Sequence, residues 1–172
     1  MSERPSTPES FVAHLAIATA EFDDRRLVQQ LEAALSDEFP ADGGWFASTV
    51  VLCRRGVDNG WLCGRGGSCV KFGRAVLPGD QTRGFSGDVL EMQDVIGRHH
   101  AHPSGEIDPS MPLDQAAEFE VRGAGWLVYR LGSVHKLRVV KSQALAPCLL
   151  PNGEFDFSGL ALSFVGENYD DY

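Results

Sequence analysis

Basic residues are scarce in this chain of 172 residues. Fifteen Lys and Arg stand against 24 Asp and Glu, which gives a formal net charge of -9. Nucleic acids and anionic membrane surfaces bind positive protein surfaces, so we expect neither as a partner. No apolar run is long enough to span a bilayer, and the first residues lack the pattern of a secretion signal. These absences favour a cytoplasmic protein.

Cysteine is also sparse, and its spacing does not indicate a metal site. Cys53, Cys63, Cys69 and Cys148 include no C-x-x-C pair, and a chain of this length does not need disulfides. We therefore predict four free thiols, although Cys63 and Cys69 could instead flank a Gly-rich hairpin and bind metal or oxidise. The sequence has no G-x-G-x-x-G motif and no phosphate loop, so no nucleotide cofactor is expected.

The apolar pattern predicts one domain in three parts. Residues 1–44 form a polar arm and two α-helices, with apolar stripes centred on Leu15 and Leu31. Residues 45–160 form a β-barrel, and residues 161–172 form an acidic tail.

Short apolar runs separated by turn residues follow Trp45, and Asp58-Asn59-Gly60 and Asn152-Gly153 are hairpin signals. Many short strands without intervening helices indicate an antiparallel sandwich or barrel. The predicted strands are Trp45–Cys53, Gly60–Cys63, Cys69–Val76, Asp88–Val95, Gly125–Arg130, Leu137–Val140, Ala144–Leu150 and Glu154–Phe157.

Three of the five histidines stand near one glutamate in a pattern typical of metal ligands. His100 and His102 alternate, so on a strand both rings share one face, with Cα atoms roughly 7 Å apart. A turn at residues 103–105 would return Glu106 beside them, and His135 could arrive from a neighbouring strand. Imidazole and carboxylate bind one divalent transition metal, and Fe, Mn, Zn, Ni and Co all remain open. Alternation points His99 away from this group.

The pattern H-x-H-x-x-x-E followed by G-S-x-H resembles the two metal motifs of the cupin superfamily. His100, His102 and Glu106 match the first motif, while Gly132 and His135 match the second. The resemblance implies a mostly β fold, with a cupin-type double-stranded β-helix barrel and the two N-terminal α-helices. It also implies that the four ligands line the inside of the barrel.

A longer string is similar to the 4-hydroxylaminobenzoate lyase family. It runs from about Trp45 to Phe157 and includes H-x-H-P-x-G-E-I-D, G-x-G-W-x-V-Y, G-S-x-H and L-L-P-x-G-x-x-x-F. This cupin-like family serves bacterial nitroaromatic breakdown. The likeness implies a metal-dependent lyase that converts 4-hydroxylaminobenzoate, a small aromatic acid, to protocatechuate and ammonia.

That chemistry needs a group that moves protons, and Asp108 and Tyr129 are the catalytic candidates. Asp108 shares the parity of Glu106 if the strand continues, but it could equally be a turn residue before Pro109. Tyr129 shares a face with Leu127, and it could instead be a core aromatic residue.

A benzoate substrate needs a cationic partner and an apolar wall. Arg74 is the first candidate for the carboxylate, because its strand belongs to the matched string, and Arg130 is the second. Phe72 and Trp126 are candidates for the wall, although each also fits an ordinary core.

Two other functions use the same four ligands. One is an Fe(II)- and O2-dependent cupin dioxygenase acting on a small aromatic compound. The other is a cupin that binds metal or ligand without turnover. The oligomeric state also stays open, although sheet edges and small size allow a homodimer.

Overall fold

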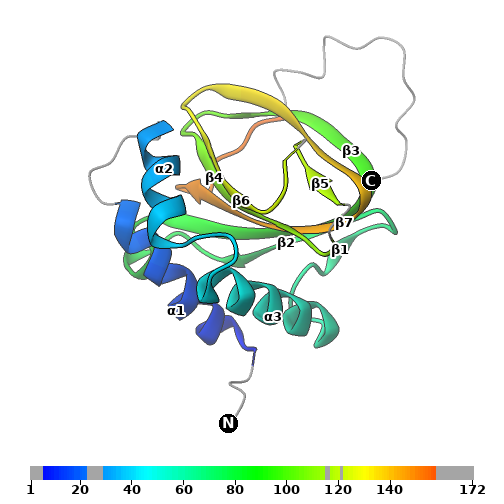
Figure 1. Cartoon of the computed structure of the whole chain (residues 1–172), viewed down its shortest axis with the longest axis horizontal. Helices are drawn as coiled ribbons and strands as arrows, with labels where there is room; N and C mark the ends of the chain where they lie inside the picture. The colour runs from blue at the N-terminus through cyan, green and yellow to red at the C-terminus, as the bar shows by residue number, and fades with distance from the viewer. Residues whose placement is uncertain (1–5, 23–28, 115–116, 121, 158–172) are drawn as a thin grey trace.

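The computed structural model describes residues 6–22, 29–114, 117–120 and 122–157 (Figure 1). The start of the predicted arm, Leu27 at the start of the second predicted helix and the acidic tail lie outside these residues. The described part contains three α-helices, two short 3-10 helices and one seven-stranded sheet. The predicted mostly β fold with helices at the N-terminus is therefore confirmed, and its form is consistent with a cupin-like barrel.

Helix α1 (Pro8–Thr19) begins as its sequence predicts. Thr7 caps the helix by accepting from the Ser10 backbone N–H, while the Ser10 hydroxyl accepts from the Thr7 N–H. Pro8 occupies the first helical position, where its fixed φ suits the turn. Helix α2 (Gln29–Glu38) ends just before Phe39, as predicted. Among the described helices, none is both long and apolar enough to cross a bilayer.

Helix α3 (Gly44–Asp58) corrects the first predicted strand, Trp45–Cys53. Its buried residues Phe46, Thr49, Cys53 and Gly56 recur every three or four positions, which is the helical period. The run of valine and leucine at residues 50–52 favours a strand locally, but packing of the helical face decides the outcome. The predicted hairpin at Asp58-Asn59-Gly60 is instead the helix end, where Gly60 adopts a φ of +77°.

The sheet is antiparallel and has the order β1-β2-β3-β7-β4-β6, with β5 also paired to β7. Strands β3 and β7 form its long centre, pairing from Phe85↔Pro151 to His102↔Ser133. Figure 1 shows the strands curling around an interior, with the helices against one side. The strand bounds are β1 (Arg65–Gly66), β2 (Val70–Val76), β3 (Phe85–His102), β4 (Glu106–Pro112), β5 (Glu118–Phe119), β6 (Gly125–Tyr129) and β7 (Ser133–Pro151).

Several predicted strands differ from those observed. The runs 137–140 and 144–150 belong to one continuous strand, β7, and Gly60–Cys63 forms no strand. Residues 154–157 form only an isolated bridge, in which Asp156 pairs with Ala101. The turn at Asn152-Gly153 is present, and both residues have a positive φ, of 54° and 69°.

The two faces of the sheet carry separate apolar cores. The helix-side core joins helix residues such as Leu15 and Leu35 to sheet residues such as Ile107 and Leu149. The inner core lies on the opposite face, toward the interior of the curled sheet. Its members are Met92, Leu127, Leu137, Val139, Ala144, Ala146 and Cys148, with Tyr129 packed against them. The alternation of Leu127 and Tyr129 against Trp126 and Val128 is as predicted.

Candidate metal centre

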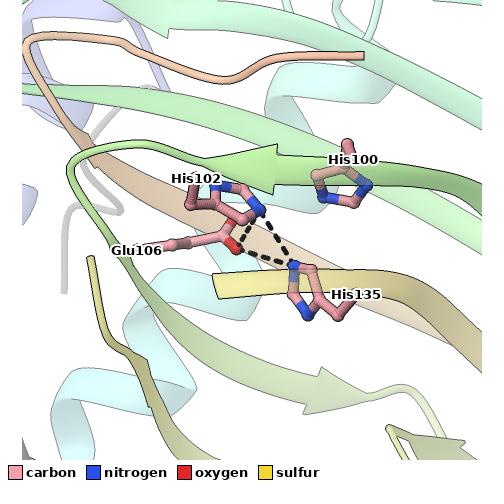
Figure 2. A group of neighbouring side chains, drawn as sticks. All are labelled: His100, His102, Glu106 and His135. Carbon is pink, nitrogen blue, oxygen red and sulfur yellow. Dashed lines mark hydrogen bonds and ion pairs between the residues drawn. The ribbon is translucent and has the colours of Figure 1, made fainter. Parts of the chain in front are cut away.

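Three strands bring four potential metal ligands together at one end of the inner face (Figure 2). His100 and His102 lie on β3, Glu106 opens β4, and His135 lies on β7 directly opposite His100. The β3–β4 turn is tight because Gly105 adopts a φ of +83° and donates its N–H to the His102 carbonyl. The turn predicted at residues 103–105 therefore returns Glu106 to the histidines.

The ligand atoms are close enough to surround one ion. The His102 Nε2 lies 2.9 Å from the His135 Nε2, and these atoms lie 2.8 Å and 3.2 Å from the Glu106 Oε2. Ligands about 2.1 Å from a metal and at right angles to one another are ~3.0 Å apart. The potential ligand atoms of all four residues lie within 4.8 Å of one another. The cluster therefore has the dimensions of a mononuclear site.

The hydrogen bonding of the imidazoles suits metal binding. The His100 Nδ1 lies 2.9 Å from the Arg98 carbonyl, which can only accept, so Nδ1 carries the proton and the Nε2 lone pair is left for an ion. The Nδ1 atoms of His102 and His135 are buried and have no hydrogen-bond partner among the described residues. Three imidazoles and one carboxylate form a donor set that divalent transition metals accept.

Burial and neighbouring groups set the charge of this cluster. Burial alone would raise the pKa of Glu106, but the imidazoles of His102 and His135 outweigh it and lower that pKa to about 2. Burial lowers the pKa of His100, which favours its neutral form. A carboxylate anion beside a neutral imidazole is the protonation pattern that a cation requires.

A second carboxyl group lies beside the four ligands. Asp108 is two residues after Glu106 on β4, shares its face, and is completely buried. Neither of its oxygens has a hydrogen-bond partner in the described part of the chain, although Cys148 and Glu106 offer atoms within 4.8 Å. Burial, with the nearby Glu106 charge, raises the pKa of Asp108 well above its usual value. The turn interpretation of Asp108 is therefore wrong.

Tyr129 also belongs to the surroundings of the ligands. It pairs with Glu106 across β4 and β6, and its ring centroid is 4.1 Å from that of His135. Burial, followed by the nearby carboxylates Asp108 and Glu120, raises the pKa of its hydroxyl. No motif in the sequence indicated Glu120 or Cys148, because their proximity to these residues depends on strand pairing.

The two predicted carboxylate-binding arginines are not gathered around the histidines. Arg74 on β2 forms a fork with Asp88, at 2.7 Å from Nε and 2.9 Å from Nη2. Its Nη2 also donates to the Gly153 carbonyl at 2.9 Å. Arg130 is exposed in the turn between β6 and β7. A hollow of about 300 Å³ adjoins Arg74 and Trp61, and none of the four potential ligands lines it.

The two predicted aromatic wall residues lie on opposite faces of the sheet. Phe72 pairs with Leu90, which packs against the inner core, and it remains 41% exposed. Trp126 lies in the helix-side core, stacked 5.0 Å from Trp45 with its Nε1 donating to the Phe39 carbonyl. We therefore place Trp126 outside the site, since the sheet separates it from the histidines.

The cysteines are free thiols, as predicted. The Cys63 Sγ donates to the Val89 carbonyl, and burial raises the pKa of Cys63 to about 12. The Cys69 Sγ instead lies 3.8 Å from the Ser68 hydroxyl. The alternative of a paired Cys63 and Cys69 is therefore not realised.

Comparisons with known proteins point to a single family. A family model described as 4-hydroxylaminobenzoate lyase matches residues 13–157. The chain is 26% identical over 161 residues to the 4-hydroxylaminobenzoate lyase of Nocardioides sp. (strain LMS-CY), covering 88% of this chain and 95% of that protein. It is 27% identical over 155 residues to that of Pseudomonas putida, covering 80% and 88%. The matched region contains all four potential ligands, and the chain belongs to the 4-hydroxylaminobenzoate lyase family.

Proposed function

We propose that this protein is a metal-dependent lyase that converts 4-hydroxylaminobenzoate to protocatechuate and ammonia. The observation that carries the proposal is the convergence of His102, His135 and Glu106, whose nearest ligand atoms lie within 3.2 Å of one another on the inner face of the sheet. The family to which the chain belongs is named for its action on this compound. Two relatives with that name support the substrate class.

The reaction balances without an external oxidant or reductant. One 4-hydroxylaminobenzoate and one water give one protocatechuate and one ammonia. The N–O bond breaks and its oxygen departs as water. One water adds its oxygen to the ring carbon beside the one that bears nitrogen, and a second water adds its oxygen to the nitrogen-bearing carbon, whose C–N bond then breaks to release ammonia, so that one water is consumed in all. Protons must reach the departing oxygen and nitrogen, and a proton must leave the attacking water. The site therefore needs a group that stabilises an oxyanion and a group that transfers protons.

The four potential ligands would supply the group that stabilises an oxyanion, by holding a metal ion. Bound by His100, His102, His135 and Glu106, a divalent metal would act as a Lewis acid toward the hydroxylamine oxygen and acidify water. Glu106 stays ionised because the two imidazoles hold its pKa at about 2, so it provides the negative charge of the site. Metal identity stays open among Fe, Mn, Zn, Ni and Co.

Asp108 would supply the group that transfers protons. Its carboxyl group lies on the face of the ligands, and its oxygens have no hydrogen-bond partner among the described residues. A carboxyl group in such surroundings holds a proton and can deliver it to a leaving group. The Tyr129 hydroxyl, on a half-buried ring beside His135, would orient the substrate as a hydrogen-bond donor.

Elemental analysis combined with an ammonia-release assay tests the proposal. The purified protein should contain about one transition-metal ion per chain. It should also release ammonia and protocatechuate from 4-hydroxylaminobenzoate at the same rate in air and under argon. Loss of turnover under argon would instead indicate the dioxygenase, and metal without turnover of any hydroxylaminobenzoate isomer would indicate a binding protein.

A further inference from the structure

After β7, the chain returns across the end of β3 that carries the metal-site histidines. The turn at Asn152-Gly153 reverses its direction, and Asp156 then pairs with Ala101 on β3. Both backbone bonds of this pair are present, with the Ala101 N–H donating to Asp156 at 2.7 Å and the Asp156 N–H donating to Ala101 at 2.8 Å. Residues 154–157, which we call the return segment, therefore lie beside His100 and His102.

The pairing decides which way the return segment presents its side chains. Residues directly opposite in an antiparallel pair share a face, and neighbours alternate. Ala101 faces away from the imidazoles of His100 and His102, so Asp156 does also. Phe155 and Phe157 then lie on the imidazole face. The ring contact agrees, since the Phe157 centroid is 5.4 Å from that of His100.

These two phenylalanines form an exposed aromatic surface beside a buried polar cluster. Their rings meet edge to face at 5.3 Å, and each side chain is 46% exposed. His100 and His102 next to them are only 7% and 1% exposed. Two half-exposed aromatic rings can take up another planar ring by stacking or edge contact. Their place at the border between solvent and ligands is where an aromatic substrate would enter.

Two contacts hold the return segment in place. Arg74 holds the turn at Asn152-Gly153 that precedes the return segment, because its guanidinium, paired with Asp88, also donates to the Gly153 carbonyl. The Ser104 hydroxyl, in the β3–β4 turn, donates to the Glu154 carboxylate. The segment is thus tied both to β2 and to the turn that delivers Glu106. Arg74 acts here on the position of a neighbouring segment, with its fork already occupied.

We propose that Phe155 and Phe157 form the wall that binds the aromatic ring of the substrate, and that Arg74 positions this wall through Gly153. The inference rests on the proposed function for the identity of the substrate, an aromatic acid. Phe155 and Phe157 thereby take the place of Trp126, which the sequence analysis assigned to the wall. Arg74 takes a positioning role in place of the predicted contact with the substrate carboxylate.

Binding of unreactive analogues tests the wall independently of turnover. Isothermal titration of the metal-loaded protein would compare 4-hydroxybenzoate with 4-hydroxycyclohexanecarboxylate, which has the same substituents on a saturated ring. The wild type should prefer the aromatic acid, and Phe155→Leu and Phe157→Leu should each weaken its binding roughly 2- to 10-fold. Binding of the saturated acid should change little, so the aromatic preference shrinks.

Val134→Ala is the matched control. Val134 pairs with Ala101, is 52% exposed, and lies on the outer face of the same strands, so its loss should leave both affinities unchanged. Metal content should stay at the wild-type value in all three variants. A drop in metal content with an unchanged aromatic preference would show that Phe157 only shields His100, and would overturn the proposal.

A second titration separates the two roles of Arg74. Arg74→Lys keeps the charge but loses the planar fork that reaches both Asp88 and Gly153. A positioning role predicts equal weakening of 4-hydroxybenzoate and of uncharged 4-hydroxybenzamide. Weakening of the benzoate alone would overturn the positioning role and restore the carboxylate contact.

The results also distinguish this inference from the proposed function. A wild type that shows the aromatic preference but releases no ammonia would contradict the lyase and keep the wall. A wild type that releases ammonia but binds the aromatic and saturated acids equally would contradict the wall alone.

Discussion

The backbone carbonyl of His102 accepts two hydrogen bonds, from the N–H of Gly105 at 3.1 Å and from that of Gly132 at 2.8 Å. Both donors lie in turns, one before Glu106 and one before His135. Each glycine has a positive φ, of 83° and 72°, which other residues adopt only at a cost. One residue therefore provides a potential ligand and also fixes the two turns that deliver its partners.

Asp108→Asn tests proton transfer at the residue scale. The change keeps the size of the side chain but removes its acidic proton. We expect turnover of 4-hydroxylaminobenzoate to fall roughly 10²- to 10⁴-fold. Metal content by elemental analysis should stay near the wild-type value, because Asp108 is not one of the four convergent ligands. A fully active variant, or one that loses its metal, would contradict this assignment.

At the scale of elements, helix α2 completes the free edge of the sheet. Strand β6 ends the strand order, and its Val128 N–H donates to the Glu32 carboxylate at 3.1 Å. The other oxygen of Glu32 pairs with Arg122 at 3.1 Å. The helix thus satisfies a backbone group that would otherwise lie unpaired at the edge, and it holds β6 opposite Glu106.

Glu32→Ala should therefore lower the free energy of unfolding by about 1–2 kcal/mol. Glu32→Gln keeps a neutral acceptor for the Val128 N–H but removes the ion pair with Arg122. Its free energy of unfolding should therefore fall by less than half as much as that of Glu32→Ala. Urea unfolding of both variants measures the difference. Equal losses would mean that the half-exposed ion pair, rather than the strand-edge bond, is the source of stability.

Local rules predicted some elements correctly and failed at others. The capping residues at Thr7 and Pro8, the turn before Glu106 and the alternation around His100 depend on nearby residues, so the sequence indicated them. Helix α3 was predicted as a strand because its valine run has β propensity, while its buried face forms only against the sheet. The helical period of that face is present in the sequence, at residues 46, 49, 53 and 56, and it outweighs the β propensity of the valine run.

At the scale of the whole molecule, metal removal tests how the site couples to the fold. The potential ligands come from β3, β4 and β7, so an ion would bind the folded chain and stabilise it. A free-metal concentration about 100 times the dissociation constant would raise the free energy of unfolding by ~3 kcal/mol. Treatment with a chelator should then lower the melting temperature by roughly 5–10 °C, and added metal should restore it.

Two variants control this experiment. His102→Ala removes a ligand, so its melting temperature should not respond to the chelator. His99→Ala should respond as the wild type does, because His99 pairs with Lys136 on the alternate face from His100. A chelator response in His102→Ala as large as in the wild type would contradict the ligand assignment.

The sequence by itself determined the candidate ligands and the local geometry that gathers them. An alternating pair of histidines, a Pro-Ser-Gly turn and a following glutamate specify their arrangement within a few residues, since strand parity and turn conformation are local properties. The interior position of Asp108 followed from the same parity once β4 was found to continue through Pro109.

Tertiary structure alone decided which other residues meet at the site. Arg74 is engaged by Asp88 and Gly153, Trp126 lies behind the sheet, and the return segment lies beside His100. Each of these depends on the pairing of strands distant in the chain, and a shift of one residue would reverse the faces. The chemical groups available for the site were readable from the sequence, whereas the residues that each group contacts depended on the register between distant strands.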